Sequence, residues 1–114
     1  MLIKKNDTKK LNPSDACELW EYPFVSDNVS IATATINGRH PASGKNFNLI
    51  VEEIYYVVSG SGVIYSDQGT FQINQGDMYH FAAGESFYVE ANNLNIVLIN
   101  APKWFESQHR HNEQ

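Results

Sequence analysis

The sequence has a single cysteine, Cys17, and no apolar run long enough to cross a bilayer. One cysteine cannot form an intramolecular disulfide, which excludes a disulfide framework. The longest strongly apolar stretches, IYYVV and NIVLI, fall far short of the roughly 20 residues that a membrane span requires. The start, MLIKKNDTKK, is too polar to contain the apolar segment of a secretory signal. These absences predict a cytoplasmic protein with no membrane segment.

Basic residues are also scarce. Eight Lys and Arg stand against 13 Asp and Glu, which gives a formal net charge of -5 at pH 7. Non-specific affinity for nucleic acid comes from clustered Lys and Arg that neutralise phosphates. The charge balance therefore argues against a nucleic-acid partner.

Apolar and aromatic residues, in contrast, are plentiful. Of the 114 residues, 42% are hydrophobic, and six Phe, six Tyr and two Trp are present. A chain of this length and composition can bury a core as one domain. We expect a single domain over 1–114, with its core at about 18–105 and with peripheral segments at 1–17 and 106–114.

Short β-branched or aromatic runs alternate with turn residues from residue 18 onward, which is typical of antiparallel sheets. No long window has a helical apolar period, although Asn12-Pro13-Ser14-Asp15 predicts one short helical turn near residues 13–17. So many short strands indicate an all-β barrel or sandwich. The expected strands are 18–24, 29–37, 46–51, 53–59, 62–66, 70–74, 77–81, 86–91 and 95–100.

Two segments carry a resemblance to a known superfamily. The segment EEIYYVVSGSGVIY contains Glu53, six residues and then Gly60, which is similar to the second half of the first cupin motif. In the first half of that motif, Asn46 and Asn48 occupy the places of the usual His-x-His pair, and Gly38 lies two residues earlier than usual. Over residues 38–91, the chain resembles a cupin.

The second cupin motif is matched mainly by its glycines. In FQINQGDMYHFAAGESFYV, Gly76 and Gly84 are retained, whereas Ala82, Phe87 and Ala91 replace the usual Pro, His and Asn. The resemblance implies an all-β cupin double-stranded β-helix, a jelly-roll-like barrel of two antiparallel sheets. It also implies a homodimer, formed through edge strands or the N-terminal segment.

The resemblance further implies a degenerate metal site, because three histidines and one Glu normally bind the cupin metal and only Glu53 remains. Asn is a weak ligand and Phe is none. A substitute site for Zn, Fe, Mn or Ni would need His40, Glu53 and His80. The alternative is that His80 is a buried, hydrogen-bonded histidine and that His40 lies exposed in a loop. We expect no metal at the usual positions.

The remaining candidates form a pocket. Asn46 and Asn48 share a strand face, so with Glu53 they either bind the hydroxyls of a polar ligand or satisfy one another. A carboxylate in an apolar barrel has a raised pKa and suits acid–base catalysis; otherwise Glu53 is simply paired with Arg39 or a tyrosine. The other expected ligand-binding residues are Arg39, which offers a clamp for an anion, Tyr55, Met78, His80 and Phe87.

Residues 101–105 resemble the tails of small stand-alone bacterial cupins, in which a proline and an aromatic residue pack on the barrel. Trp104 is expected to close one end. The sequence thus predicts a cupin that binds a small polar, carbohydrate-like molecule. The alternative is an enzyme, an isomerase, epimerase or oxygenase, that uses Glu53 and His80 with or without a metal.

Overall fold

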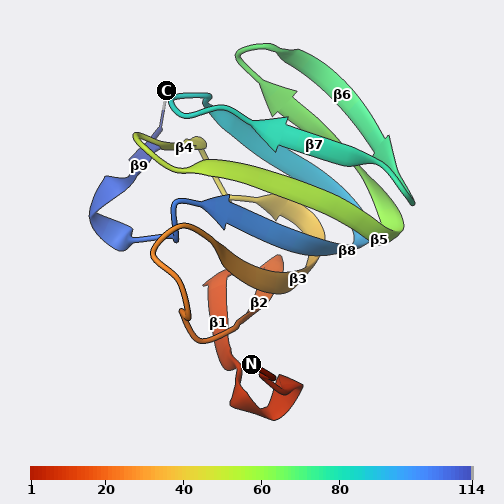
Figure 1. Cartoon of the computed structure of the whole chain (residues 1–114). Helices are drawn as coiled ribbons and strands as arrows, with labels where there is room; N and C mark the ends of the chain where they lie inside the picture. Colours follow the sequence, from red (N-terminus) through yellow and green to blue (C-terminus); the bar gives the residue numbers. More distant parts are fainter. Residues whose placement is uncertain (114) are drawn as a thin grey trace.

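The computed structural model describes residues 1–113, and nearly all of its regular structure is antiparallel β-sheet (Figure 1). The only helical pieces described are two 3₁₀ turns of three residues each. The elements are η1 (Lys5–Asp7), β1 (Lys9–Ser14), β2 (Cys17–Glu21), β3 (Ser30–His40), β4 (Lys45–Asn48), β5 (Glu52–Ser66), β6 (Gly69–Asn74), β7 (Met78–Phe81), β8 (Phe87–Ala101), η2 (Glu106–Gln108) and β9 (His109–Asn112). The expected all-β class is confirmed.

The strands pair in the order β1-β2-β3-β8-β4-β9, and β5 pairs with β6, β7 and β8. In Figure 1 this sheet curls on itself, with β1 and β2 extending below it and β9 lying beside β4. Strand β8 is central because it pairs with both β3 and β5 over most of its length. The curled sheet has one inner face, and this face holds the core.

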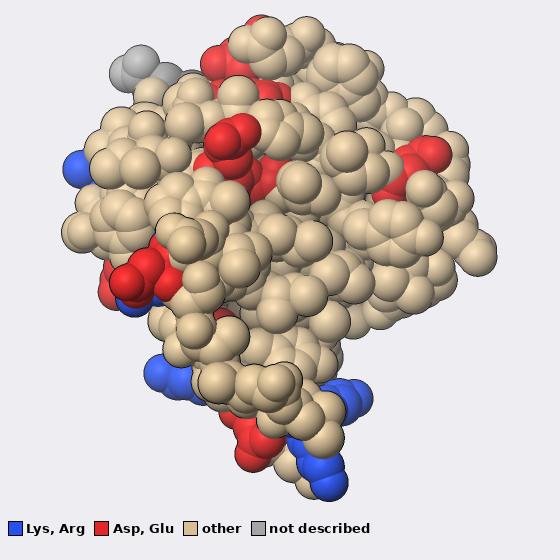
Figure 2. All heavy atoms as spheres, in the orientation of Figure 1, with Lys and Arg blue, Asp and Glu red and all other residues tan. Residues whose placement is uncertain are grey.

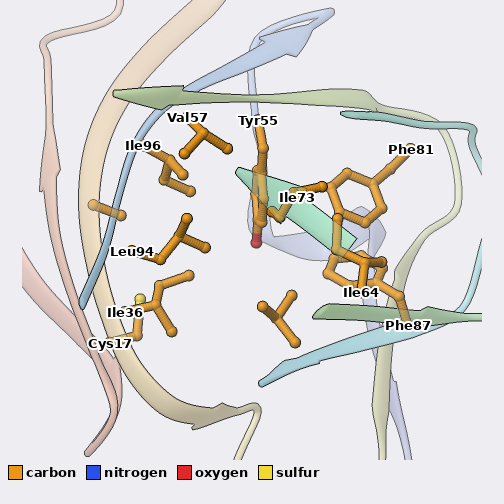
Figure 3. Close-up of a cluster of buried hydrophobic side chains, with 12 residues drawn as sticks. Cys17, Ile36, Tyr55, Val57, Ile64, Ile73, Phe81, Phe87, Leu94 and Ile96 are labelled. Atoms are coloured by element: carbon orange, nitrogen blue, oxygen red, sulfur yellow. The ribbon is translucent and has the colours of Figure 1, made fainter. Parts of the chain in front are cut away.

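Alternation along these strands selects the inner residues. Ala34, Ile96 and Val57 lie in register across β3, β8 and β5, and all three side chains are buried. The neighbouring positions on the same strands face outward, because successive side chains of a strand point to opposite faces. Figure 3 shows the resulting cluster, in which the Tyr55 ring lies between Leu94 and Ile36 on one side and Phe81 and Phe87 on the other.

Two pairs of expected strands are each one continuous strand. The runs 53–59 and 62–66 form β5, and 86–91 and 95–100 form β8. The turn residues between them are bulges at which both strands bend together: Gly60 has φ +78°, and Asn93 opposite it has φ 46°. A bulge bends a strand without ending its pairing, so these turn signals mark a corner of the barrel.

The two chain ends are less peripheral than expected. The short helical turn expected at 13–17 is absent, since Ser14 pairs with Cys17 in a hairpin that joins β1 to β2. Residues 109–112 form β9, which pairs with β4. Both ends therefore extend the sheet, because their short runs find unpaired strand edges that local sequence patterns do not reveal.

Candidate functional site

A cavity of about 400 Å³ opens between the inner faces of β2, β3, β5 and β8. Most of its wall is apolar, from residues such as Ala34, Ile36, Leu19, Ile96 and Leu98. Several polar side chains also reach it, including His40, Asn46, Glu53, Tyr55, Asn100 and His109. A largely apolar pocket with a few converging polar groups is the usual form of a small-molecule site.

Glu53 is the buried acid of this cavity, with 7% of its surface exposed. Asn100 Nδ2 donates to Glu53 Oε1 at 3.0 Å. Burial raises the pKa of the Glu53 carboxyl above its usual value, and hydrogen bonds from Asn100 and Asn48 partly oppose this rise. Loss of hydration disfavours the charged form more than the two amides favour it. Glu53 is thus biased toward the protonated acid.

Tyr55 lies one register step from Glu53 on the same inner face and is 3% exposed. Its ring packs edge-on against Phe81 at 4.8 Å between centroids and against Phe87 at 6.4 Å. Within the described residues 1–113, no side chain or backbone group makes a hydrogen bond with the Tyr55 hydroxyl. The hydroxyl oxygen keeps some access to solvent through the cavity. Buried hydroxyls normally have partners, so this one is available to a ligand.

His40 ends β3 and reaches the same cavity. Its Nδ1 makes a 2.7 Å hydrogen bond with Ser14 Oγ of β1, which leaves Nε2 for a ligand. Burial, aided by the neighbouring His109, lowers the pKa of His40 from 6.5 to about 4. The ring is therefore neutral at physiological pH and able to accept a proton.

The C-terminal segment completes the wall with Trp104 and His109, whose ring centroids lie 6.0 Å apart. Gln108 holds this segment in place: it is 2% exposed, its Nε2 donates to Asn48 Oδ1 at 2.9 Å, and its Oε1 accepts from the backbone N–H of Val51 at 3.2 Å. Burial is the main cause that lowers the pKa of His109.

The structure places some of the expected site residues together. Four of them line the cavity: Asn46, Glu53, Tyr55 and Phe87. Asn48 is instead buried behind the cavity wall, where its Oδ1 accepts a hydrogen bond from Gln108 Nε2. Asn46 is also engaged, because its Oδ1 lies 2.7 Å from His111 Nδ1. Of the two asparagines, only Asn46 is placed to meet a ligand.

The expected interior position of His80 and Met78 is wrong. Met78 is 59% exposed, and His80 Nε2 lies 2.6 Å from Glu52 Oε1 on the outer surface of the sheet. Strand β7 buries Phe81 on the inner face, so the period of two directs His80 outward. His80 therefore cannot act with Glu53 in one site.

Two further expectations are also wrong in their geometry. His40 is not in an exposed loop, because β3 continues to it and the alternation from Ile36 through Gly38 keeps it inward. Arg39 consequently faces outward, where its guanidinium stacks on the Tyr88 ring at 4.0 Å. Arg39 Nη1 and Nη2 also donate to the carbonyls of Pro41 and Gly44, so it does not clamp an anion in the cavity.

Sequence reasoning missed Asn100 and His109. The alternation Leu94, Ile96, Leu98 along β8 points to an inward Asn100, so that signal was present. His109 follows a loop and a 3₁₀ turn, and no local pattern places it in the cavity.

Within residues 1–113, no group of three or more His, Cys, Asp and Glu side chains is arranged to hold a metal ion. Cys17, beside Glu53 and Tyr55, has its pKa raised by burial to about 12, which keeps it a thiol.

Comparison with solved structures identifies the fold. Pac13, described as a nucleoside dehydratase with a β-barrel, superimposes with a TM-score of 0.89 at 21% identity, over 99% of this chain and 91% of that chain. Structures of Streptomyces Pac13 variants contain uridine; one variant, with a tyrosine changed to phenylalanine, matches with a TM-score of 0.89 at 21% identity over 99% of this chain and 90% of that chain.

More distant structures agree. KdgF from Halomonas sp. gives a TM-score of 0.75 at 10% identity, over 91% of this chain and 96% of that chain. Ectoine synthase from P. lautus gives a TM-score of 0.74 at 19% identity, over 98% of this chain and 90% of that chain. No family model matches the sequence, and no curated protein is significantly similar to it.

These neighbours are cupin-fold proteins, so the chain is a small domain with the cupin fold. The expected double-stranded β-helix is confirmed. Cupin-fold neighbours include both enzymes and binding proteins, so the fold alone does not choose between them. In the described part of the chain, no helix has the length and apolar character needed to cross a membrane.

Proposed function

We propose that this protein is a metal-independent acid–base enzyme that removes water from a small hydroxylated molecule of the nucleoside type. The observation that carries the proposal is the presence of a neutral histidine, His40, and a carboxyl biased toward its acid form, Glu53, in one apolar cavity. Two groups whose environments drive their pKa values in opposite directions are the usual basis of acid and base roles.

The chemistry follows from these two groups. His40 Nε2 takes a proton from a carbon of the substrate, a C=C bond forms, and the C–O bond to the neighbouring hydroxyl breaks. Glu53 donates its proton to the departing oxygen, so that water leaves. Proton transfer from His40 back to Glu53 through the released water restores both groups.

The aromatic groups suit a flat ring. Phe87 and Trp104 line the cavity, and the Tyr55 hydroxyl lacks a partner among the described residues. Aromatic faces bind planar rings, and the phenol can donate to a carbonyl or accept from a hydroxyl. The similarity to Pac13, a nucleoside dehydratase, supports the same ligand class.

The test uses chelator-treated, untagged protein and a panel of nucleosides and free sugars that begins with uridine. Loss of one water is followed by mass spectrometry, and bound metal by plasma emission spectroscopy. We expect turnover without metal, a fall of about 100-fold or more in His40→Gln and Glu53→Gln, and no change in His80→Gln, which alters the outer surface. Loss of turnover on chelation, or full activity in His40→Gln, would contradict the proposal.

A second candidate is a non-catalytic binding protein for a polar, carbohydrate-like molecule. It is favoured by the hydrogen bonds that Asn100 and Asn48 make to Glu53, since they occupy part of the carboxyl. Tight binding of a panel member without any turnover would select this candidate.

A homodimer in the cytoplasm also remains a proposal. The outer face of the sheet exposes Tyr56, Val58 and Met78, each between 45% and 59%. Large exposed apolar groups near one another often mark an interface. Light scattering during size-exclusion chromatography tests the dimer: the mass of one chain over the micromolar range would exclude it.

A further inference from the structure

The charged side chains that line the cavity are all acidic in the described part of the chain. They are Glu53 inside it, Glu21 at the end of β2 and Glu106 at the start of η2. Glu106 is exposed and Glu21 is half-buried, so these two carboxylates lie toward the solvent-facing side, whereas Glu53 is deep. None of the described Lys or Arg side chains lines the cavity.

The two histidines of the wall do not supply a positive charge. Burial lowers the pKa of His40 to about 4, and it also lowers that of His109. Both rings are therefore neutral near pH 7. Because Glu53 is biased toward its acid form, the negative potential at the cavity comes from the carboxylates of Glu21 and Glu106.

The positive charges are placed elsewhere. Arg39 stacks on Tyr88 on the outer surface, and Lys103 Nζ is paired with Asp27 Oδ1 at 2.8 Å. Half of the eight basic residues are exposed in the N-terminal segment 1–10: Lys4, Lys5, Lys9 and Lys10. Figure 2 shows blue atoms gathered at that lower end of the molecule. The N-terminal lysines therefore lie on segment 1–10 and not on the cavity wall.

Binding an anionic ligand in this cavity would cost electrostatic free energy. A phosphate or carboxylate loses hydration there, gains no cation and lies near like charges. A hydroxyl or amide avoids this penalty, because the Tyr55 hydroxyl lines the cavity, has no hydrogen-bond partner within residues 1–113 and is available to hydrogen-bond with it.

We propose that the cavity selects uncharged ligands and rejects phosphorylated and carboxylated ones, with Glu21 and Glu106 as the residues that determine this specificity. The inference rests on the proposed function, because it names the substrate class of the same site. It also places the protein in a reaction sequence. If its substrate is made as a phosphate ester, a phosphomonoester hydrolysis must precede this step.

The test compares matched pairs of probes by isothermal titration calorimetry at low ionic strength: uridine with uridine 5′-monophosphate, and glucose with glucose 6-phosphate. We expect at least one uncharged member to bind and its phosphorylated partner to bind about 100-fold more weakly or not at all. The difference should shrink at high salt, because salt screens charges near the surface.

A double variant, Glu21→Gln with Glu106→Gln, should reduce the discrimination about tenfold by strengthening nucleotide binding. Glu90→Gln is the matched control, because Glu90 is an exposed carboxylate of β8 that lies outside the cavity. Circular dichroism confirms that each variant is folded.

The outcomes separate the two proposals. Equal or tighter binding of a phosphorylated probe, no binding by any uncharged probe, or unchanged discrimination in the double variant would overturn the selectivity. Selective binding of uridine without turnover would instead overturn the enzymatic function and leave the selectivity intact.

Discussion

Asn100 Nδ2 lies 3.0 Å from Glu53 Oε1, and this hydrogen bond joins two neighbouring strands inside the barrel. The pairing partner of Glu53 on β8 is Asn100 itself, so the contact follows directly from the register. It places the amide against the one buried acid of the cavity. The environment of Glu53 is thus set by a residue nearly half the chain away in sequence.

Asn100→Ala should raise the pKa of Glu53 further. The amide hydrogen bond favours the carboxylate, so its loss leaves burial less opposed. Carbon-13 NMR of the glutamate carboxyls over a pH series measures the shift. In Asn95→Ala, which alters the outer side of the same strand, the Glu53 titration should stay where it is in the unmodified protein.

His40 makes stability depend on pH. Its pKa is about 4 in the folded protein against an ordinary 6.5, so the unfolded chain binds the proton more readily between these values. Stability should therefore be full above about pH 6.5 and decline as the pH falls toward 4, by up to roughly 3 kcal/mol.

Urea unfolding at a series of pH values measures this decline. His40→Gln should lose much of it, while His80→Gln, changed on the outer surface, should keep it. An equally steep decline in His40→Gln would show that other groups control the acid limb.

Gln108→Ala should destabilise the protein by about 2–4 kcal/mol. The side chain accepts hydrogen bonds from the backbone N–H groups of Ile50 and Val51 and donates to Asn48, and its removal leaves buried polar groups without partners. Chemical denaturation measures the loss. The exposed Gln72 is the control, and Gln72→Ala should change stability by no more than about 0.5 kcal/mol.

Gly60→Ala should be far more damaging than Gly76→Ala. Both glycines have positive φ, +78° and +88°, so alanine costs backbone strain at each. At Gly60, however, an added Cβ would overlap the Asn93 carbonyl oxygen in the opposing bulge, whereas at Gly76 it meets open space. We expect alanine to lower the free energy of unfolding by about 1 kcal/mol at Gly76 and by several times more at Gly60, as measured by urea unfolding. Equal losses at the two positions would show that the backbone around Gly60 and Asn93 moves to accommodate the added Cβ.

The sequence by itself determined the all-β class, the position of most strands and the burial of Glu53, Tyr55 and Phe87. These features depend on local alternation and turn residues, and on glycine and glutamate spacing shared with cupins. Such signals lie within a few residues of one another, so they can be read without coordinates.

Only the tertiary structure decided which other groups meet Glu53. The pattern of β7 gave no sign of which face is inner, so His80 was expected inside and is outside. His40 was expected in a loop, but it reaches the cavity because β3 continues to it. Asn100 and His109 enter through strand register and through pairing of β9 with β4. These contacts join residues distant in sequence, and the free energy that selects them comes from burying the whole sheet.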